Sequence, residues 1–308
     1  MTAWRVTDIF VIRADVFRYP QSLACPVTMI DTHVHVVAPD RERYPVLADP
    51  PAWPTVTGSA LSADMDAEGV TRALLVQSFF TYGFDNSYAI DCAAADPARY
   101  QVVCVIDQTA PDAPERLAWL VREHGVRGVR LMPKGMPEGV LWDPKTFGVW
   151  ERAGELGIPV TVAAEIQHMP RMPEVVERFP DLTVCFEHMW GIEVDRPPFS
   201  QLKPVVALAG FANVRLKLAP NNCFAAREAG IRPRALFDHL IEHFGIGRLM
   251  FGSNYPAHPS RFGDYAARVA IMREDLSYLS DDEQEAFFCS NAARVWPVDA
   301  PSTGTGDD

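Results

Sequence analysis

Eight short apolar runs, rich in β-branched residues, alternate with longer amphipathic stretches along most of this chain. The runs cover residues 29–36, 73–77, 102–107, 128–132, 159–164, 183–188, 213–218 and 249–254. Several are apolar at consecutive positions, as expected for parallel strands buried on both faces. Helical patterns occupy 110–125, 144–157, 173–179, 198–209 and 234–244. Eight strands, each followed by a crossover, predict an α/β fold, a distorted (β/α)8 TIM barrel.

A doubly wound open sheet is the main alternative for an alternating chain of this kind. That fold usually carries a glycine-rich turn directly after its first strand. Here the first run continues as HVHVVAPD, which contains no glycine. The length of 308 residues also suits a single barrel domain. The sequence therefore favours the barrel.

The segments outside the barrel pattern indicate where the domain begins and ends. Residues 1–28 precede the first strand, and we expect them to form an N-terminal extension packed on the barrel. The barrel itself is predicted to cover 29–299, and the tail 300–308 is predicted to be disordered. A Pro-rich loop at 39–60 follows the first strand. Loops this long in a compact domain are usually functional, for example as lids.

Composition narrows the classes of partner. Lysine and arginine number 28 against 40 acidic residues, which gives a formal net charge of −12. Such a chain has no electrostatic footprint for nucleic acid or for an anionic membrane surface. The N-terminus lacks a signal-peptide core, and the six cysteines form no CxxC pair. We therefore expect a cytoplasmic protein with a small-molecule substrate and with no nucleic-acid or membrane partner.

Polar side chains mark the ends of several predicted strands. His33 and His35 are two apart on the first strand, so both point to the same face. His188 ends the sixth run, and Asn254 ends the eighth. Arg130 lies within the fourth run, and a buried arginine needs an anionic partner. Barrel active sites lie at the C-terminal ends of the strands, so we expect these side chains to line one mouth.

The chain resembles the amidohydrolase superfamily, in the branch that holds lactonases and aromatic-acid decarboxylases. The resemblance rests on ordered segments that span roughly residues 29–257, among them IDTHVHV, GVTRALLVQ, VREHGVRGVRLMP, ERFPDLTVCFEHMWG and RLMFGSNYP. It implies an amidohydrolase-type barrel with either a mononuclear metal site or a metal-free site.

Position by position, the resemblance assigns roles to four residues. His33 and His35 match first-strand histidines that are metal ligands in metal-dependent members and substrate ligands in metal-free lactonases. His188 matches the sixth-strand histidine, and Arg130 matches a basic residue that holds a substrate carboxylate. The resemblance thus implies that the three histidines are catalytic and offer three nitrogens to one divalent metal, with zinc as the first choice.

Two positions depart from the family pattern. The fifth strand of many metal-dependent members ends in a histidine, but this run reads Val162, Ala163, Ala164, Glu165. The eighth-strand position, usually an aspartate that activates water, is Asn254. An amide does not accept a proton at neutral pH, so Asn254 is expected in the catalytic group only as a weak metal ligand. Without a metal, a histidine or Glu165 must act as the base, or the chemistry is not hydrolysis.

Further substrate-binding residues are predicted from their positions after the strands. Gln77 ends the second strand, and Tyr82 belongs to the aromatic segment SFFTYGFDN that follows it. Glu165 and His168 follow the fifth strand, and His258 follows the eighth. We expect these five side chains to reach the pocket.

Other ionisable side chains are assigned elsewhere. His124, His239 and His243 lie on predicted helices away from the mouth and are expected to be structural. Lys217 lies within the seventh run, and the sequence leaves open whether it points into the pocket or toward a helix. The acidic residues are expected on the outer helices and loops. A mouth poor in carboxylates suits an anionic ligand.

Three functions are compatible with these features. The first is hydrolysis of a lactone or similar cyclic ester that carries a carboxylate. The second is metal-dependent non-oxidative decarboxylation of an aromatic or unsaturated acid. The third, suggested by Asn254, is a barrel adapted to binding or to a non-hydrolytic rearrangement. The N-terminal arm and the Pro-rich loop would also suit a homodimer.

Overall fold

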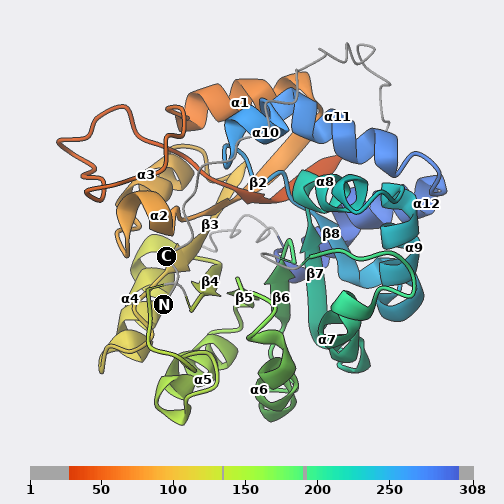
Figure 1. Cartoon of the computed structure of the whole chain (residues 1–308). Coiled ribbons are helices and arrows are strands. Elements are labelled where there is room, and N and C mark those ends of the chain that lie inside the picture. Colours follow the sequence, from red (N-terminus) through yellow and green to blue (C-terminus); the bar gives the residue numbers. More distant parts are fainter. Residues whose placement is uncertain (1–27, 134, 190–192, 298–308) are drawn as a thin grey trace, which may run out of the picture.

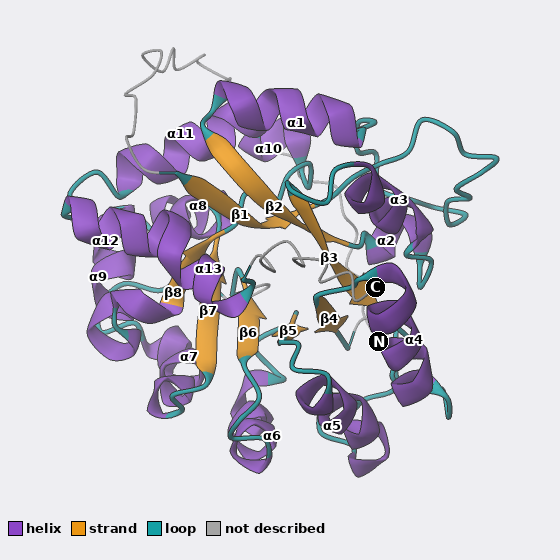
Figure 2. Ribbon diagram, turned by 180° about the vertical axis from the view of Figure 1, so that it is seen from behind, coloured by secondary structure: helices purple, strands orange, loops and turns teal. Residues whose placement is uncertain are grey.

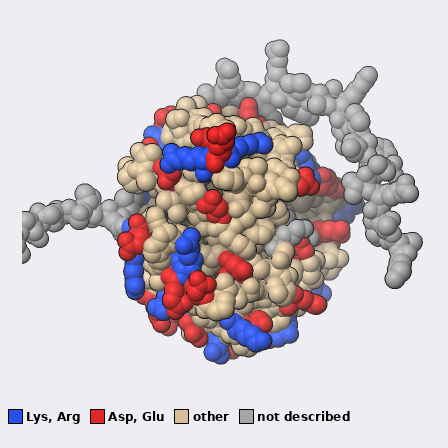
Figure 3. Space-filling view, turned by 90° about the vertical axis from the view of Figure 1, so that its left-hand side faces the viewer, with Lys and Arg blue, Asp and Glu red and all other residues tan. Residues whose placement is uncertain are grey.

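The computed structural model describes residues 28–133, 135–189 and 193–297. Nearly all of the predicted N-terminal extension and the whole predicted tail 300–308 lie outside these residues. No helix in the described ranges is both long and apolar enough to cross a membrane. On the face shown in Figure 3, described acidic and basic side chains are interspersed rather than gathered by sign.

Eight parallel strands form one sheet in which each strand pairs with the next along the chain, as the barrel prediction requires (Figure 1). Each predicted run overlaps one of them. The strands are β1 (Met29–Val34), β2 (Val70–Val76), β3 (Tyr100–Val105), β4 (Gly128–Leu131), β5 (Val160–Val162), β6 (Val184–Glu187), β7 (Val214–Leu218) and β8 (Leu249–Phe251).

Helices surround the strands on the outside (Figure 2). The α-helices are α1 (Gly58–Ala67), α2 (Phe79–Tyr82), α3 (Ser87–Ala95), α4 (Ala113–His124), α5 (Phe147–Glu155), α6 (Met172–Arg178), α7 (Lys203–Val206), α8 (Pro220–Glu228), α9 (Pro233–Phe244), α10 (Pro259–Phe262), α11 (Tyr265–Asp275), α12 (Asp281–Glu285) and α13 (Asn291–Val295). Short 3-10 and π turns are η1 (Pro144–Thr146), η2 (Met169–Arg171), η3 (Ser200–Leu202), η4 (Ala207–Gly210), η5 (Ile246–Arg248) and η6 (Ala286–Ser290). The predicted helix 198–209 is therefore divided into η3, α7 and η4.

The seam between the first and last strands is closed by the residues that follow β8. The backbone N–H of Asn254 donates to the carbonyl of His33 at 2.8 Å, and that of His35 donates to the carbonyl of Tyr255 at 2.7 Å. The buried Asp31 carboxylate accepts the N–H of Ser253 at 2.9 Å. These bonds fix the first and eighth strand ends against each other, which places His33, His35 and Asn254 together.

Side chains fill the interior of the barrel, as in TIM barrels generally. Ile30, Leu74 and Met250 pack in one buried cluster with Trp296, which follows α13. The indole N–H of Trp296 donates to the carbonyl of Arg127, which directly precedes β4. The contact therefore lies at the N-terminal end of the strands. Trp296 thus closes the end of the barrel opposite the mouth.

Candidate active site

A cavity of about 530 Å³ opens at the C-terminal ends of the strands. Its lining comes from many points of the chain: His35, Asp49, Pro50, Pro51, Trp53, Ser78, Phe80, Arg130, Glu187, His188, Asn221, Asn254, Ala257 and His258. This is the end of a barrel where strand-terminal residues converge, and the volume suits a small molecule.

His35 lines this cavity, and His33 lies fully buried beside it. Their Nε2 atoms lie 3.2 Å apart, and both side chains are buried. Nδ1 of His35 is 2.7 Å from the carbonyl oxygen of Val76, which can only accept, so Nδ1 carries the proton. Burial, followed by the charge of Arg130, lowers the pKa of His35 to about 4. His35 is therefore neutral at pH 7, with a bare Nε2 directed at His33.

Nδ1 of His33 faces the Glu187 carboxylate, with Oε1 at 3.4 Å. Burial lowers the pKa of His33 well below its ordinary value, so this ring is also neutral. The neutral ring carries one proton: on Nδ1 it faces the carboxylate, and on Nε2 it donates to the bare Nε2 of His35. The first tautomer leaves two converging bare nitrogens, which is the arrangement that a metal ion between them requires.

Glu187 is the principal site residue that the sequence analysis missed. Its carboxylate is almost completely buried and accepts from Nε of Arg130 at 2.7 Å. Nζ of Lys217 lies 3.9 Å away on the other side. Burial alone would raise the pKa of Glu187, but Arg130, His33 and Lys217 hold it well below its usual range. The carboxylate therefore stays ionised and is a poor proton acceptor.

These contacts correct one expectation and answer one question that the sequence left open. The anionic partner of Arg130 within the protein is Glu187, so the mouth does contain a carboxylate. Lys217 points into the barrel, where it donates to the carbonyl of Thr32 at 2.9 Å and lies 4.9 Å from the ring centre of Trp296. Two cations flank a single carboxylate, so positive charge predominates under the cavity.

His188 lies beside the histidine pair, with its ring centre 4.2 Å from that of His33. Its backbone has a positive φ of 51°, and its carbonyl accepts from the Asn222 amide at 2.8 Å. Within the described part of the chain, neither ring nitrogen of His188 has a hydrogen-bond partner. Burial is the main cause that lowers its pKa to about 3, so the ring is neutral. It offers a free nitrogen at the cavity wall.

Asn254 also has a positive φ, 53°, which asparagine tolerates better than most residues. Its carbonyl accepts from the buried Arg268 guanidinium at 2.7 Å, and this bond holds the strained turn. Its side-chain amide donates to Asn221 at 3.2 Å. The side-chain oxygen of Asn254 is thus left to accept from a ligand or water.

Among the remaining predicted residues, Arg130 and His258 line the cavity, but four do not. The amide of Gln77 donates to the carbonyls of Gly83 and Asp85, and so holds the turn after α2. The hydroxyl of Tyr82 accepts from the N–H of Ala38 at 2.7 Å. These local backbone contacts draw both side chains away from the pocket.

The two predicted residues that follow β5 are also outside the lining. Glu165 accepts a hydrogen bond from its neighbour Gln167. His168 packs against Trp142, with ring centres 6.0 Å apart. The suggestion that Glu165 is the base of a metal-free reaction is therefore not supported by its position.

The long loop 39–60 contributes aromatic cover. Trp53 stacks on His35 with ring centres 5.2 Å apart and planes 25° from parallel. Asp49, Pro50 and Pro51 extend the same wall. The length and proline content of the loop indicated a functional role, but nothing in the sequence singled out Trp53.

The three predicted metal ligands are only partly brought together. His33 and His35 converge, and His188 lies against His33, but the three do not place ligand atoms within 4.8 Å of one another. In the described ranges, the one group of three ligand side chains that does so lies on α9.

Comparison with known proteins agrees with this architecture. A family model described as Amidohydrolase matches residues 30–298. An L-fucono-1,5-lactonase from Burkholderia ambifaria is 27% identical over 301 residues, which cover 89% of this chain and 97% of the lactonase.

Two solved structures share the fold. One, from Pseudomonas putida, is provisionally assigned as a 2-pyrone-4,6-dicarboxylic acid hydrolase. It has a TM-score of 0.71 and 24% identity, covering 87% of this chain and 97% of that one. The other is a 5-carboxyvanillate decarboxylase from Novosphingobium aromaticivorans with bound manganese, with a TM-score of 0.61 and 14% identity over 89% of this chain and 98% of that one. With its family model matched over most of its length, the chain belongs to the amidohydrolase family.

Proposed function

We propose that this protein hydrolyses a lactone or similar cyclic ester of an anionic small molecule. The observation that carries the proposal is the cluster of Arg130, Lys217 and Glu187, which has a net positive charge and touches the neutral histidine pair through Glu187. The relative named as a lactonase supports the reaction class. The volume of about 530 Å³ limits the substrate to a small molecule.

Arg130 would hold the carboxylate of the substrate. Its Nε is committed to Glu187, which leaves the terminal nitrogens of the guanidinium for a ligand at the cavity wall. A guanidinium forms two parallel hydrogen bonds with a carboxylate, which fixes orientation as well as charge. Trp53 and Phe80, which also line the cavity, would pack against a ring.

The donor types of the three histidines suit one divalent metal, since zinc prefers such nitrogen ligands. His33 and His35 direct their Nε2 atoms at each other, 3.2 Å apart, and the buried ring nitrogens of His188 have no hydrogen-bond partner among the described residues. We propose that these three side chains hold the metal. When bound, it would polarise the ester carbonyl and lower the pKa of a water molecule.

The ring-opening step adds water to the ester carbonyl and breaks its bond to the ring oxygen, which yields a hydroxy acid. Asn254 cannot take the proton from water, but its free side-chain oxygen can accept a hydrogen bond and orient the water. His258, which also lines the cavity, carries a pKa lowered mainly by burial and can accept a proton.

A second candidate is decarboxylation of an aromatic acid, favoured by the shared fold with the manganese-bound decarboxylase. Assays with a panel of carboxylated lactones and aromatic acids distinguish the two functions. Ring opening is measured by the release of protons, and decarboxylation by the release of carbon dioxide. We expect the protein to open lactone rings. A chelator should abolish this activity, and added zinc should restore it. The His188→Ala variant should lose most of the activity. Carbon dioxide release without ring opening would refute the proposal.

The third candidate, a non-hydrolytic barrel, is motivated by Asn254 at the cavity wall. Asn254→Asp restores a carboxylate at the position where it activates water. If the native protein opens no lactone and Asn254→Asp does, the site is adapted away from hydrolysis.

A further inference from the structure

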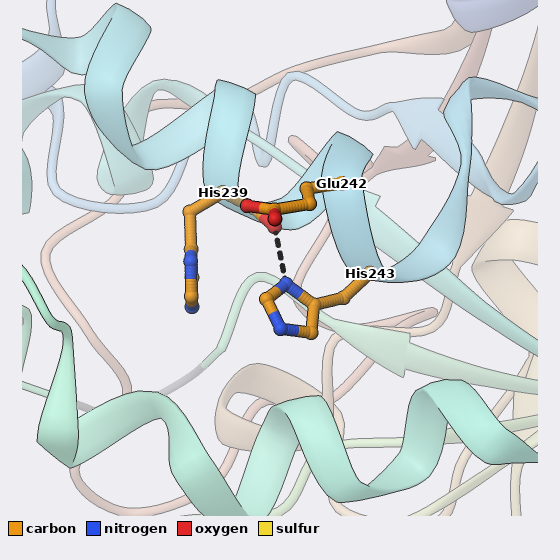
Figure 4. A group of neighbouring side chains, drawn as sticks. All are labelled: His239, Glu242 and His243. Atoms are coloured by element: carbon orange, nitrogen blue, oxygen red, sulfur yellow. Dashed lines mark hydrogen bonds between the residues drawn. The ribbon is translucent and has the colours of Figure 1, made fainter.

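A second group of metal-ligand side chains lies on α9, outside the catalytic cavity. His239, Glu242 and His243 are spaced i, i+3 and i+4, so they share one face of the helix. One ligand atom from each lies within 4.8 Å of the others (Figure 4). The helix forms part of the outer ring, beside α7 and α8 (Figure 1). None of the three side chains lines the cavity at the mouth.

The two histidine rings are already oriented. Nδ1 of His243 lies 2.8 Å from the carbonyl oxygen of His239 and must donate to it, which leaves Nε2 as a bare acceptor. A ligand histidine characteristically donates its other nitrogen to a carbonyl in this way. The ring of His239 packs against Phe199, with centres 4.7 Å apart. This contact restricts the half-buried side chain before any ligand arrives.

The local charge favours a dication. Glu242 adds a carboxylate to the two imidazole donors, and the negative charge of Asp195 also acts on His239. The three residues occupy the C-terminal part of α9, which ends at Phe244. Partial negative charge accumulates at that end of a helix. The side chain of Arg248 is directed to the carbonyls of Phe244 and His243, so the ligand atoms themselves stay free of it.

The ligand atoms of the three side chains are near enough to one another to close around a tetrahedral metal ion. Ligands about 2.1 Å from zinc stand roughly 3.4 Å apart, so modest side-chain rotations convert a 4.8 Å group into a coordinating one. Two imidazoles and one carboxylate are donors that zinc accepts, and an exposed site leaves a fourth position for water.

We propose that His239, Glu242 and His243 form a surface binding site for a divalent transition metal, represented by zinc, separate from the catalytic cavity. Both histidines were expected from the sequence to be structural. Bound metal would link two successive turns of α9 and so stabilise the folded chain.

Calorimetric titration of the metal-stripped full-length protein with zinc chloride tests the site. We expect His239→Gln combined with His243→Gln to bind one zinc equivalent fewer than the native chain. His243→Gln alone, at an exposed position, should weaken that equivalent by at least about tenfold, because the loss of a hydrogen-bond partner behind a ligand already costs that much. Equal stoichiometry in the native and double-variant chains would overturn the proposal.

His124→Gln is the matched control, because His124 is also a helical histidine but belongs to no such group of ligand side chains among the described residues. It should bind zinc like the native chain. Without metal, all variants should melt at similar temperatures, whereas added zinc should raise the Tm of the His124→Gln chain more than that of the double variant. An equal zinc-induced rise in both would contradict the site.

Discussion

Glu187→Gln is the substitution that most directly probes the charged cluster under the cavity. The change keeps the shape of the side chain but removes its charge, and leaves Arg130 and Lys217 without their shared anion. All three side chains are at most 7% exposed, so water does not replace the lost partner. Removing one member of a buried ion pair costs about 3–5 kcal/mol.

For a chain of this size, a loss of that order lowers the Tm by roughly 6–10 °C, at about 2 °C per kcal/mol. Urea or thermal unfolding measures the change. Since the pKa of Glu187 is held well below its usual range, its contribution is present above about pH 4.5 and is lost as pH falls through the folded-state value. The difference between native and variant chains should therefore narrow in acid.

The matched control is Glu174→Gln, which breaks the exposed pair with Arg171. Exposed pairs contribute about 1 kcal/mol or less. The double variant Glu187→Gln/Lys217→Met restores the original charge balance and should recover part of the loss. If Glu187→Gln costs no more than the control, the buried cluster does not have the energetic role assigned to it.

Two further predictions concern the loop and the histidines. Trp53→Ala removes the ring stacked on His35, so we expect a raised KM for a ring-shaped substrate. The change in Tm should be small, because Trp53 is partly exposed. An unchanged KM would show that the loop does not take part in substrate binding. His35 and His188 have folded-state pKa values of about 4 and about 3 against 6.5 when unfolded, so the unfolded chain takes up protons first as pH falls. The metal-free protein should lose up to about 1.4 kcal/mol per pH unit per histidine below pH 6.5, and His188→Gln should show a shallower slope in urea unfolding. Identical slopes in the two chains would contradict neutral burial of His188.

Much of the fold could be predicted because the strand runs are apolar at consecutive positions and their crossovers have a clear helical period. The strand ends were less accurate. The predicted runs 159–164 and 249–254 shorten to β5 and β8 of three residues each. Their last residues lie beyond the sheet, and Asn254 among them lines the cavity. Local hydropathy does not distinguish such a residue from a strand residue.

Site residues were predictable where the alternation of side chains along a strand decides which face they point to, as for His33 and His35. Glu187 was missed because its role depends on Arg130, His33 and Lys217 meeting across three other strands. The need of Arg130 for a buried anion was the available signal. Gln77 and Tyr82 were misplaced because nearby backbone groups satisfy them, which strand position alone does not show.

The rate of ring opening for a matched pair of lactones, one with a free carboxylate and one with its methyl ester, tests the central claim most directly. Arg130→Lys keeps a cation for Glu187 but loses the planar fork that would hold a carboxylate. A charge-assisted hydrogen bond contributes about 1.5–3 kcal/mol, or roughly 10- to 150-fold in rate. The native chain should prefer the carboxylate, and the variant should lose most of that preference while opening the ester at a similar rate. Equal rates for both lactones in the native chain, or a preference that survives Arg130→Lys, would contradict the account.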